Sequence, residues 1–260
     1  MAGIRKQWLD KVGDVDVERV TGVKRSNTTA DLSVPPKGDL HTTEGGRASS
    51  IAVFTSSTGT PTFGAGRAED GKLHVDQFMP IGEMALTLQN DAGGTETNRE
   101  CRVQIEVYAF SRQTTKPRWF LGLNKKEMDD ATKNLLADLV YDASEAAGIP
   151  HRHAGKGFLN RSLSQWDTVA GWYGHSETPE NDHWDPGTFD WADLFARGER
   201  WEVWLITGRG GKDEVVAKSD RVRGNEVRGL STRFVASKAG KFSRLLVTGK
   251  RPRFVRHQVR

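Results

Sequence analysis

The residues with the clearest chemical potential lie between Gly174 and Gly187. This stretch of fourteen residues holds two histidines, four acidic residues and two prolines, and it closes on Asp-Pro-Gly. Proline and glycine at these places favour a fixed loop over a helix. If the loop brings His175 and Asp185 together, they offer an imidazole nitrogen and a carboxylate oxygen, which are both zinc ligands.

His183 lies two residues before Asp185. In an extended stretch, residues two apart point to the same side, so His183 could face the same pocket without being a ligand. The alternative is that the stretch is an ordinary histidine-rich surface turn. A zinc site would need a third ligand from elsewhere in the chain.

The run Gly174–Gly187, followed by Phe189-Asp190-Trp191 and Leu194, closely resembles a family of zinc amidases. These are the type 2, peptidoglycan-recognition-protein-like N-acetylmuramoyl-L-alanine amidases, and the nearest likeness is to endolysins from phages of actinobacteria. In that family a Gly-His-Ser-type turn, a proline-containing loop and Asp-Pro-Gly close the zinc site. The resemblance covers roughly residues 38–197. It implies a mixed α/β fold, in which helices flank a central mixed β-sheet.

The same resemblance implies that His41 is the first zinc ligand. The family places a histidine at the end of its first core strand, often as His-Thr-Thr-Glu-Gly, and the sequence has this motif from His41 to Gly45. The family usually has an apolar run before this histidine, whereas the flank here is Lys-Gly-Asp-Leu, so we expect a strand that is short or partly exposed. Without the resemblance, a lone histidine before two threonines is more often a hydrogen-bonded surface residue.

A third candidate, Glu106, lies on a predicted strand. Residues 101–108 alternate, with Cys101, Val103, Ile105 and Val107 on one face and Arg102, Gln104, Glu106 and Tyr108 on the other. The family carries Gln-Ile-Glu or Gly-Ile-Glu at this place, with its glutamate beside the zinc. The alternative is a solvent-facing glutamate on an exposed sheet face.

Cysteine usage narrows the metal chemistry. Cys101 is the only cysteine, so the chain forms no internal disulfide and no cysteine-based zinc site. We expect Cys101 to be a small core residue. Of the other histidines, His151 and His153 are expected at the groove wall or surface, and His74 at solvent or the groove.

The resemblance assigns a role to each candidate. His41, His175 and Asp185 hold Zn²⁺ and leave one position for water, whose pKa falls to about 7. Glu106 takes the proton of that water and passes it to the leaving amine, and His183 donates to the oxyanion. The bond is the amide between N-acetylmuramic acid and the L-alanine of the peptidoglycan stem peptide.

Two rivals are a non-catalytic peptidoglycan-binding protein, which usually lacks a ligand, and another zinc hydrolase such as a peptidase. The sequence contains no His-Glu-X-X-His motif, which disfavours the peptidase.

The sequence also predicts some of the strands and helices that must position these residues. Residues 14–20 are predicted as a short strand, and residues 61–78 as a hairpin around Asp70-Gly71. The spacing of apolar residues predicts a helix from Asn124, as its cap, to Ala147, stopped by Gly148. A short helix is predicted over residues 189–196, with Thr188 as its cap.

Charge divides the chain. Residues 199–260 hold 16 Lys+Arg and 6 Asp+Glu, a net +10, which leaves −6 for residues 1–198 of a chain with net charge +4. We therefore expect three parts: a lead-in over 1–36, the amidase domain over 37–198, and a small basic β-rich module over 199–260.

The strands of this basic module should include residues 232–235, and Gly208–Lys212 should form a hairpin turn. The module's charge could attract anionic wall polymers; it has no nucleic-acid motif, so no nucleic-acid partner is expected.

The expected location of the protein follows from the resemblance and from the absence of two targeting signals. No run approaches the ~20 apolar residues of a membrane span, and the N-terminus lacks the apolar stretch of a signal peptide. We expect a phage lysis protein that accumulates in the host cytoplasm and acts on the bacterial cell wall once the membrane is breached. A virion-borne wall-degrading protein is the alternative.

Overall fold

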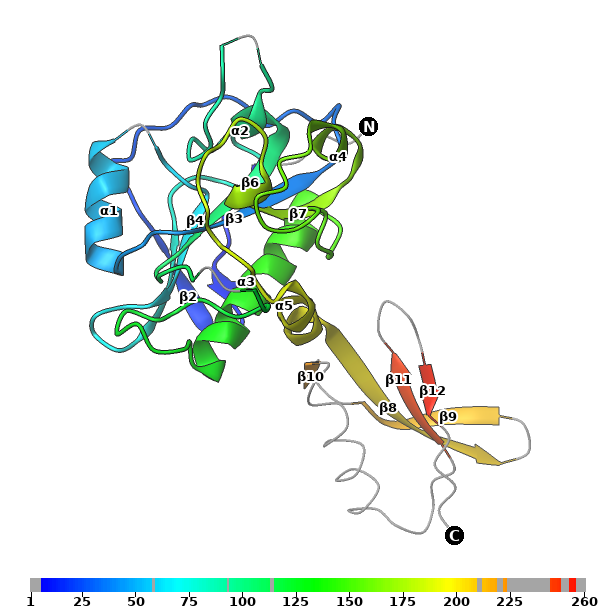
Figure 1. Cartoon of the computed structure of the whole chain (residues 1–260). Coiled ribbons are helices and arrows are strands. Elements are labelled where there is room, and N and C mark those ends of the chain that lie inside the picture. Colours follow the sequence, from blue (N-terminus) through cyan, green and yellow to red (C-terminus); the bar gives the residue numbers. More distant parts are fainter. Residues whose placement is uncertain are drawn as a thin grey trace. The chain divides into compact units, whose positions relative to one another are not determined.

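The computed structural model describes residues 6–57, 59–92, 94–112, 115–209, 212–218, 222–223, 244–248 and 253–255. By its internal contacts the chain divides into two compact units, Met1–Phe195 and Ala196–Arg260. Each unit is built on its own β-sheet (Figure 1).

The first unit is a mixed α/β fold with a seven-stranded sheet, which confirms the expected α/β class. The strand order is β1-β2-β5-β4-β6-β3-β7. The strands are β1 Lys11–Val12, β2 Val15–Arg19, β3 Lys37–Thr42, β4 Phe63–Arg67, β5 Leu73–Gln77, β6 Cys101–Val107 and β7 Gly171–Gly174. The helices are α1 Arg47–Ser56, α2 Thr97–Glu100, α3 Asp130–Ala147, α4 Leu163–Thr168 and α5 Trp191–Gly198, with a short 3₁₀ helix, η1, at His175–Glu177.

The second unit is described over five strands. They are β8 Arg200–Arg209, β9 Lys212–Lys218, β10 Val222–Arg223, β11 Arg244–Thr248 and β12 Arg253–Val255. Strands β8 and β9 pair antiparallel up to Arg209 and Lys212, as a hairpin requires. The predicted hairpin glycines 210 and 211 and the predicted strand at 232–235 lie outside the described residues.

One face of the first sheet is apolar and carries the long helix. Val103, Ile105 and Val107 of β6 share one buried cluster with Leu40 of β3 and with Leu139 of α3. Because side chains alternate along a strand, the residues between them point to the opposite face. The apolar face is therefore covered by α3, and polar residues of β3 and β6 lie on the other face.

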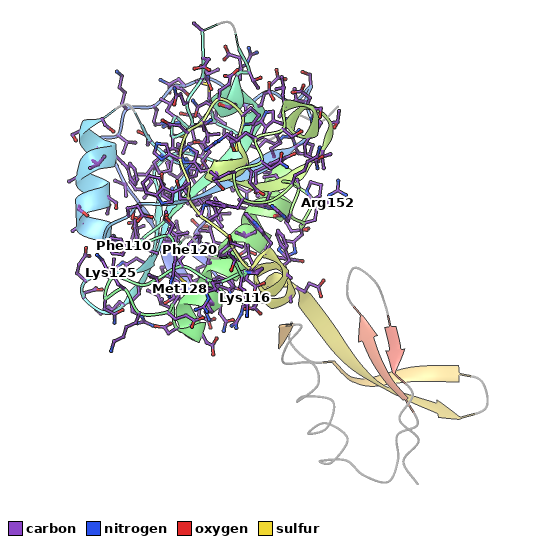
Figure 2. The ribbon with its side chains drawn as sticks, viewed as in Figure 1. Phe110, Lys116, Phe120, Lys125, Met128 and Arg152 are labelled. Carbon is purple, nitrogen blue, oxygen red and sulfur yellow. The ribbon has the colours of Figure 1, made fainter. Side chains whose placement is uncertain are left out.

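The connection between β6 and α3 is anchored in the same core. Phe120 and Met128 are buried, and Lys125 lies 5.1 Å from the ring centroid of Phe110 (Figure 2). This connection also corrects the predicted start of the helix. Asn124 caps a turn by accepting from the main chain of Lys126, whereas α3 begins at Asp130.

The actual caps differ from the predicted ones in both helices. Asp129 caps α3 by accepting from the main-chain N–H of Thr132. Gly148 ends the helix in the left-handed conformation, with φ +66°, as predicted. Helix α5 begins at Trp191 and not at Phe189, and Asp190 accepts from the N–H of Asp193. Both helices begin later than expected because an aspartate nearer to them takes the capping role.

The expectation of a short, partly exposed first core strand is wrong. All six residues of β3 are buried, because it lies between β6 and β7. Lys37 is buried by pairing with Glu100 at 3.2 Å and by lying 4.9 Å from the ring centroid of Trp166. Gly38 leaves room for the buried ring of Trp172. The polar flank is thus compatible with a central strand, since each residue has a specific neighbour.

The remaining local predictions are confirmed. Residues 15–19 form β2, and β4 and β5 form the antiparallel hairpin around Asp70-Gly71. Cys101 is a buried free cysteine. Within the described residues, no helix has both the length and the apolar character to cross a membrane.

Gly38→Ala tests the packing of the central strand. A Cβ at this position would lie 2.7 Å from two ring carbons of Trp172, so we expect a loss of about 1–3 kcal/mol in the free energy of unfolding. Gly122→Ala is the control, because its Cβ would meet no atom closer than 3.8 Å. Urea unfolding measures both; equal midpoints for the two variants would show that Trp172 does not press on Gly38.

Candidate metal centre

Strand topology brings two of the predicted residues, His41 and His175, to one edge of the sheet. Strand β3 runs parallel to both β6 and β7. His41 is the fifth residue of β3, and His175 directly follows the end of β7. Because parallel strands end at the same edge, these two side chains meet although they are 134 residues apart.

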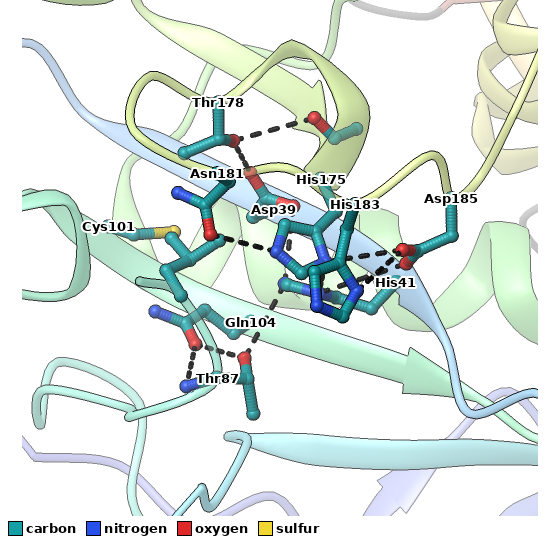
Figure 3. Close-up of polar contacts among 12 residues, drawn as sticks. Asp39, His41, Thr87, Cys101, Gln104, His175, Thr178, Asn181, His183 and Asp185 are labelled. Atoms are coloured by element: carbon teal, nitrogen blue, oxygen red, sulfur yellow. Dashed lines mark hydrogen bonds and ion pairs between the residues drawn. The ribbon is translucent and has the colours of Figure 1, made fainter. Parts of the chain in front are cut away.

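The predicted ligands converge. His41 Nδ1 lies 3.0 Å from His175 Nδ1, and Asp185 Oδ1 lies 3.3 Å from His175 Nδ1 (Figure 3). Asp185 Oδ2 lies 4.0 Å from His41 Nδ1. One ligand atom from each residue lies within 4.8 Å of the others, and all three residues are buried. This triad could hold a metal ion.

The short distance between the two imidazole nitrogens requires a proton or a cation between them. Two imidazole nitrogens that face each other at 3.0 Å in a buried site repel unless a proton or a cation lies between them. The Nε2 atoms point elsewhere, that of His175 to Asn181 Oδ1 at 2.9 Å and that of His41 to Asp39 Oδ1 at 3.2 Å. The donor set of two imidazoles and one carboxylate therefore fits a metal ion.

Electrostatics keep His41 and Asp185 in their metal-binding forms. Burial, and then the neighbouring His175, hold the pKa of His41 well below its ordinary value. Burial alone would raise the pKa of Asp185, but the imidazoles of His175 and His183 outweigh it and hold this pKa well below the ordinary range. Neutral imidazole and ionised carboxylate are the forms that bind metals.

Glu106 lies beside the triad without belonging to it. In the β3–β6 ladder it pairs with His41, and its Oε1 lies 4.0 Å from His41 Nδ1. Its Oε2 is buried and has no hydrogen-bond partner in the part of the chain that the structure describes. Burial, together with the charges of Asp185 and Glu44, raises the pKa of Glu106 well above its ordinary value. A cation at the triad would act in the opposite direction, so the group is poised to exchange a proton.

His183 lies on the outer side of the triad. Its ring stacks on His175 with centroids 4.3 Å apart, and its Nδ1 lies 3.5 Å from Asp185 Oδ1. The side chain is 58% exposed, so it faces both the site and solvent. Its interaction with Asp185 raises the pKa of His183. The neighbouring Trp184 is also exposed and donates its indole N–H to Ser111 Oγ at 3.1 Å.

The loop that carries His175 is fixed by Glu177, which the sequence analysis did not assign. This buried carboxylate accepts from the main-chain N–H groups of Gly174 and Gly157, at 2.9 and 2.7 Å, and pairs with His153 Nε2 at 2.8 Å. The main-chain N–H of Ser176 donates to the carbonyl of Asp185 at 2.6 Å, which closes the loop.

The other histidines lie outside the triad. His153 stacks on Trp191 besides pairing with Glu177, and His151 packs between the rings of Tyr141 and Phe195. His74 lies between Glu18 and Asp70. Among the described residues, the one group of three or more His, Cys, Asp or Glu that could hold a metal ion is His41, His175 and Asp185.

Three polar residues of the site were missed. Asp39 could have been found, because it is two residues before His41 on a strand and so shares its face. Thr87 and Asn181 lie on irregular segments, where no periodicity indicates which way a side chain points.

Comparison with known proteins adds no identification: no protein-family model matches the sequence, and no curated protein matches it.

Metal binding is directly measurable. We expect the purified chain to hold about one divalent metal ion, and His175→Ala to lose it, because the triad would keep only two ligands. His74→Ala is the matched control, since that histidine lies outside the triad. Elemental analysis after gel filtration gives the stoichiometry. Equal metal content in both variants would place the metal elsewhere.

Proposed function

We propose that this protein is a zinc-dependent N-acetylmuramoyl-L-alanine amidase that degrades peptidoglycan. The observation that carries the proposal is that His41, His175 and Asp185 lie together in a buried site, next to Glu106, whose buried Oε2 has no hydrogen-bond partner among the described residues. An unsatisfied buried polar group lowers stability. A buried carboxylate oxygen without a partner is therefore not expected in a site that only stabilises the fold.

Zinc is the metal that best suits the donors. Two histidines, a carboxylate and one remaining position are typical of catalytic zinc. With bonds of 2.0–2.2 Å, donor atoms of a tetrahedral site lie about 3.3 Å apart. The separations of 3.0 and 3.3 Å around His175 Nδ1 are close to this value. When bound, zinc would supply an acidified water and polarise the scissile carbonyl.

Glu106 is the group suited to move the proton. Its carboxylate accepts a proton from the attacking water, whose oxygen bonds to the amide carbonyl carbon. The C–N bond then breaks, and Glu106 returns the proton to the nitrogen, which leaves as the amine of L-alanine. The lactyl carbonyl ends as a carboxylate. Burial raises the pKa of Glu106, and a nearby cation would lower it again. A carboxyl group with such a balanced pKa can both accept the proton and return it.

His183 is suited to stabilise the negative charge that develops on the carbonyl oxygen. Its ring lies directly over His175, it is accessible from solvent, and Asp185 favours its protonated form. A positioned donor of this kind contributes about 3–4 kcal/mol to the transition state.

The substrate assignment rests on the resemblance of Gly174–Gly187 and of the His41 motif to the type 2 amidases. The same resemblance supports action as a phage endolysin, with a virion-borne wall-degrading role as the alternative. The net charge of +10 over residues 199–260 favours a contact with anionic wall polymers, because opposite charges concentrate a polymeric partner near the enzyme.

Glu106→Gln separates catalysis from binding. We expect the variant to keep its zinc and to lose about 10²–10⁴-fold in the rate of soluble peptide release from purified peptidoglycan, since the amide side chain cannot accept the proton. The control is Glu145→Gln, which neutralises an exposed carboxylate on α3. If the wild type itself binds peptidoglycan and zinc but releases nothing, the protein is a binding module and not an amidase.

His183→Ala tests the second role. We expect kcat to fall about 10²–10³-fold with zinc retained, and His183→Lys to recover part of the loss, because a lysine again presents a charged donor. A change confined to KM would indicate that His183 binds the substrate and does not stabilise the transition state.

A further inference from the structure

The position of the proton on each imidazole decides whether the triad can bind a metal. A neutral imidazole has one N–H and one lone pair, and only the lone pair coordinates. The Nδ1 atoms of His41 and His175 face the site. The groups that face the two Nε2 atoms therefore control metal binding, and hydrogen-bond donors with fixed roles identify the proton positions.

The amide of Asn181 has one possible orientation. Its Oδ1 accepts from the main-chain N–H of Gln89 at 2.7 Å. Its Nδ2 donates to the main-chain carbonyls of Pro179, at 2.7 Å, and Gln89, at 3.3 Å. Main-chain N–H groups only donate and carbonyls only accept, so the amide cannot be flipped. The atom 2.9 Å from His175 Nε2 is therefore an oxygen, which can only accept (Figure 3).

A second chain of fixed roles leads to His41. Asn98 is oriented by the main chain of Leu88, which donates to its Oδ1 at 2.9 Å and accepts from its Nδ2 at 2.6 Å. Gln104 then donates to Asn98 Oδ1 at 3.2 Å, while its own Oε1 accepts from the main-chain N–H of Thr87 at 2.9 Å.

The hydroxyl of Thr87 completes this chain. It donates to the same Gln104 oxygen, so its proton is already committed. Only its lone pairs remain for His41 Nε2, which lies 3.5 Å away (Figure 3). The carboxylate of Asp39 faces the same nitrogen. Burial raises the pKa of Asp39 well above its ordinary value, so Asp39 can donate as well as accept. The acceptor with a fixed role is Thr87, which favours a proton on Nε2 of His41, as Asn181 does on His175.

We infer that residues 87–92 and 94–98, joined to the loop 174–187 by Asn181, hold both histidines with the proton on Nε2 and the lone pair of Nδ1 toward the metal. Asn181 and Thr87 are positioning residues, since they act through His175 and His41. The segment is itself held in place, because Glu180 accepts from the main-chain N–H groups of Asp91 and Thr95, at 3.0 and 2.6 Å. The inference rests on the metal site of the proposed function and not on the amide as substrate.

Asn181→Leu is the decisive variant, because it keeps the shape of the side chain and removes the acceptor. We expect its affinity for Zn²⁺ alone, measured by competition with a chromogenic chelator, to fall about 10–100-fold. Asn181→Asp retains an oxygen that can accept from His175 Nε2. It should therefore bind zinc more tightly than Asn181→Leu does. The control is Asn124→Leu, an amide that bonds Lys126 away from the triad, which should bind zinc as the wild type does.

A second measurement needs no variant. Long-range ¹H–¹⁵N correlation spectra of the zinc-loaded full chain report which ring nitrogen of each histidine is protonated. We expect Nε2–H for His175 and His41. A proton on Nδ1 of His175, or equal zinc affinity in Asn181→Leu and Asn124→Leu, would overturn the inference. If zinc and proton positions are as expected but peptidoglycan is not cleaved, the amidase proposal fails and this inference stands.

Discussion

The structure depends most on the approach of two buried imidazole nitrogens, His41 Nδ1 and His175 Nδ1, to 3.0 Å. Such a contact is unfavourable unless a proton or a cation lies between the two nitrogens, so the chain must hold the rings in place by other means. The parallel pairing of β3 and β7 supplies the backbone positions, and hydrogen bonds to Nε2 orient the rings. The packing of the first unit thus holds the two rings in positions from which they could bind a cation.

The sheet separates stabilisation from chemistry. On one face, apolar residues of β3 and β6 pack against α3 and form the main core. On the other face, the alternate residues of the same strands, Asp39, His41, Gln104 and Glu106, take part in the metal centre. Side chains alternate between the two faces of a strand, so every second residue of β3 and β6 points toward the site. The register of β3 on β6 places His41 beside Glu106.

Local sequence patterns were enough to predict much of the fold, whereas His41 was added to His175 and Asp185 only through the family resemblance. The alternation over Cys101–Val107, the Asp70-Gly71 hairpin and the stop at Gly148 are each determined by neighbouring residues, and each was confirmed. The start of α3 was wrong because Asn124 and Asp129 are both good caps, and the turn formed around Lys125, with φ +56°, takes Asn124 out of the helix.

The supporting residues of the centre could not be predicted in the same way. The exposed first strand was expected because Lys37 and Asp39 are polar, but their partners Glu100 and Thr178 come from distant parts of the chain. Asn181 reaches Gln89 across 92 residues, and the contact depends on how two loops pack and not on either sequence. A polar residue in a loop therefore shows its role only when the fold is known.

The central proposal is that this protein cleaves the amide between N-acetylmuramic acid and L-alanine. The most direct test treats purified peptidoglycan with the zinc-loaded full chain and labels both new amino termini and new reducing sugar ends. The proposed chemistry predicts new N-terminal L-alanine, in step with the release of soluble peptide, and no new reducing ends. New reducing ends, or new amino termini from residues other than the first L-alanine, would contradict it.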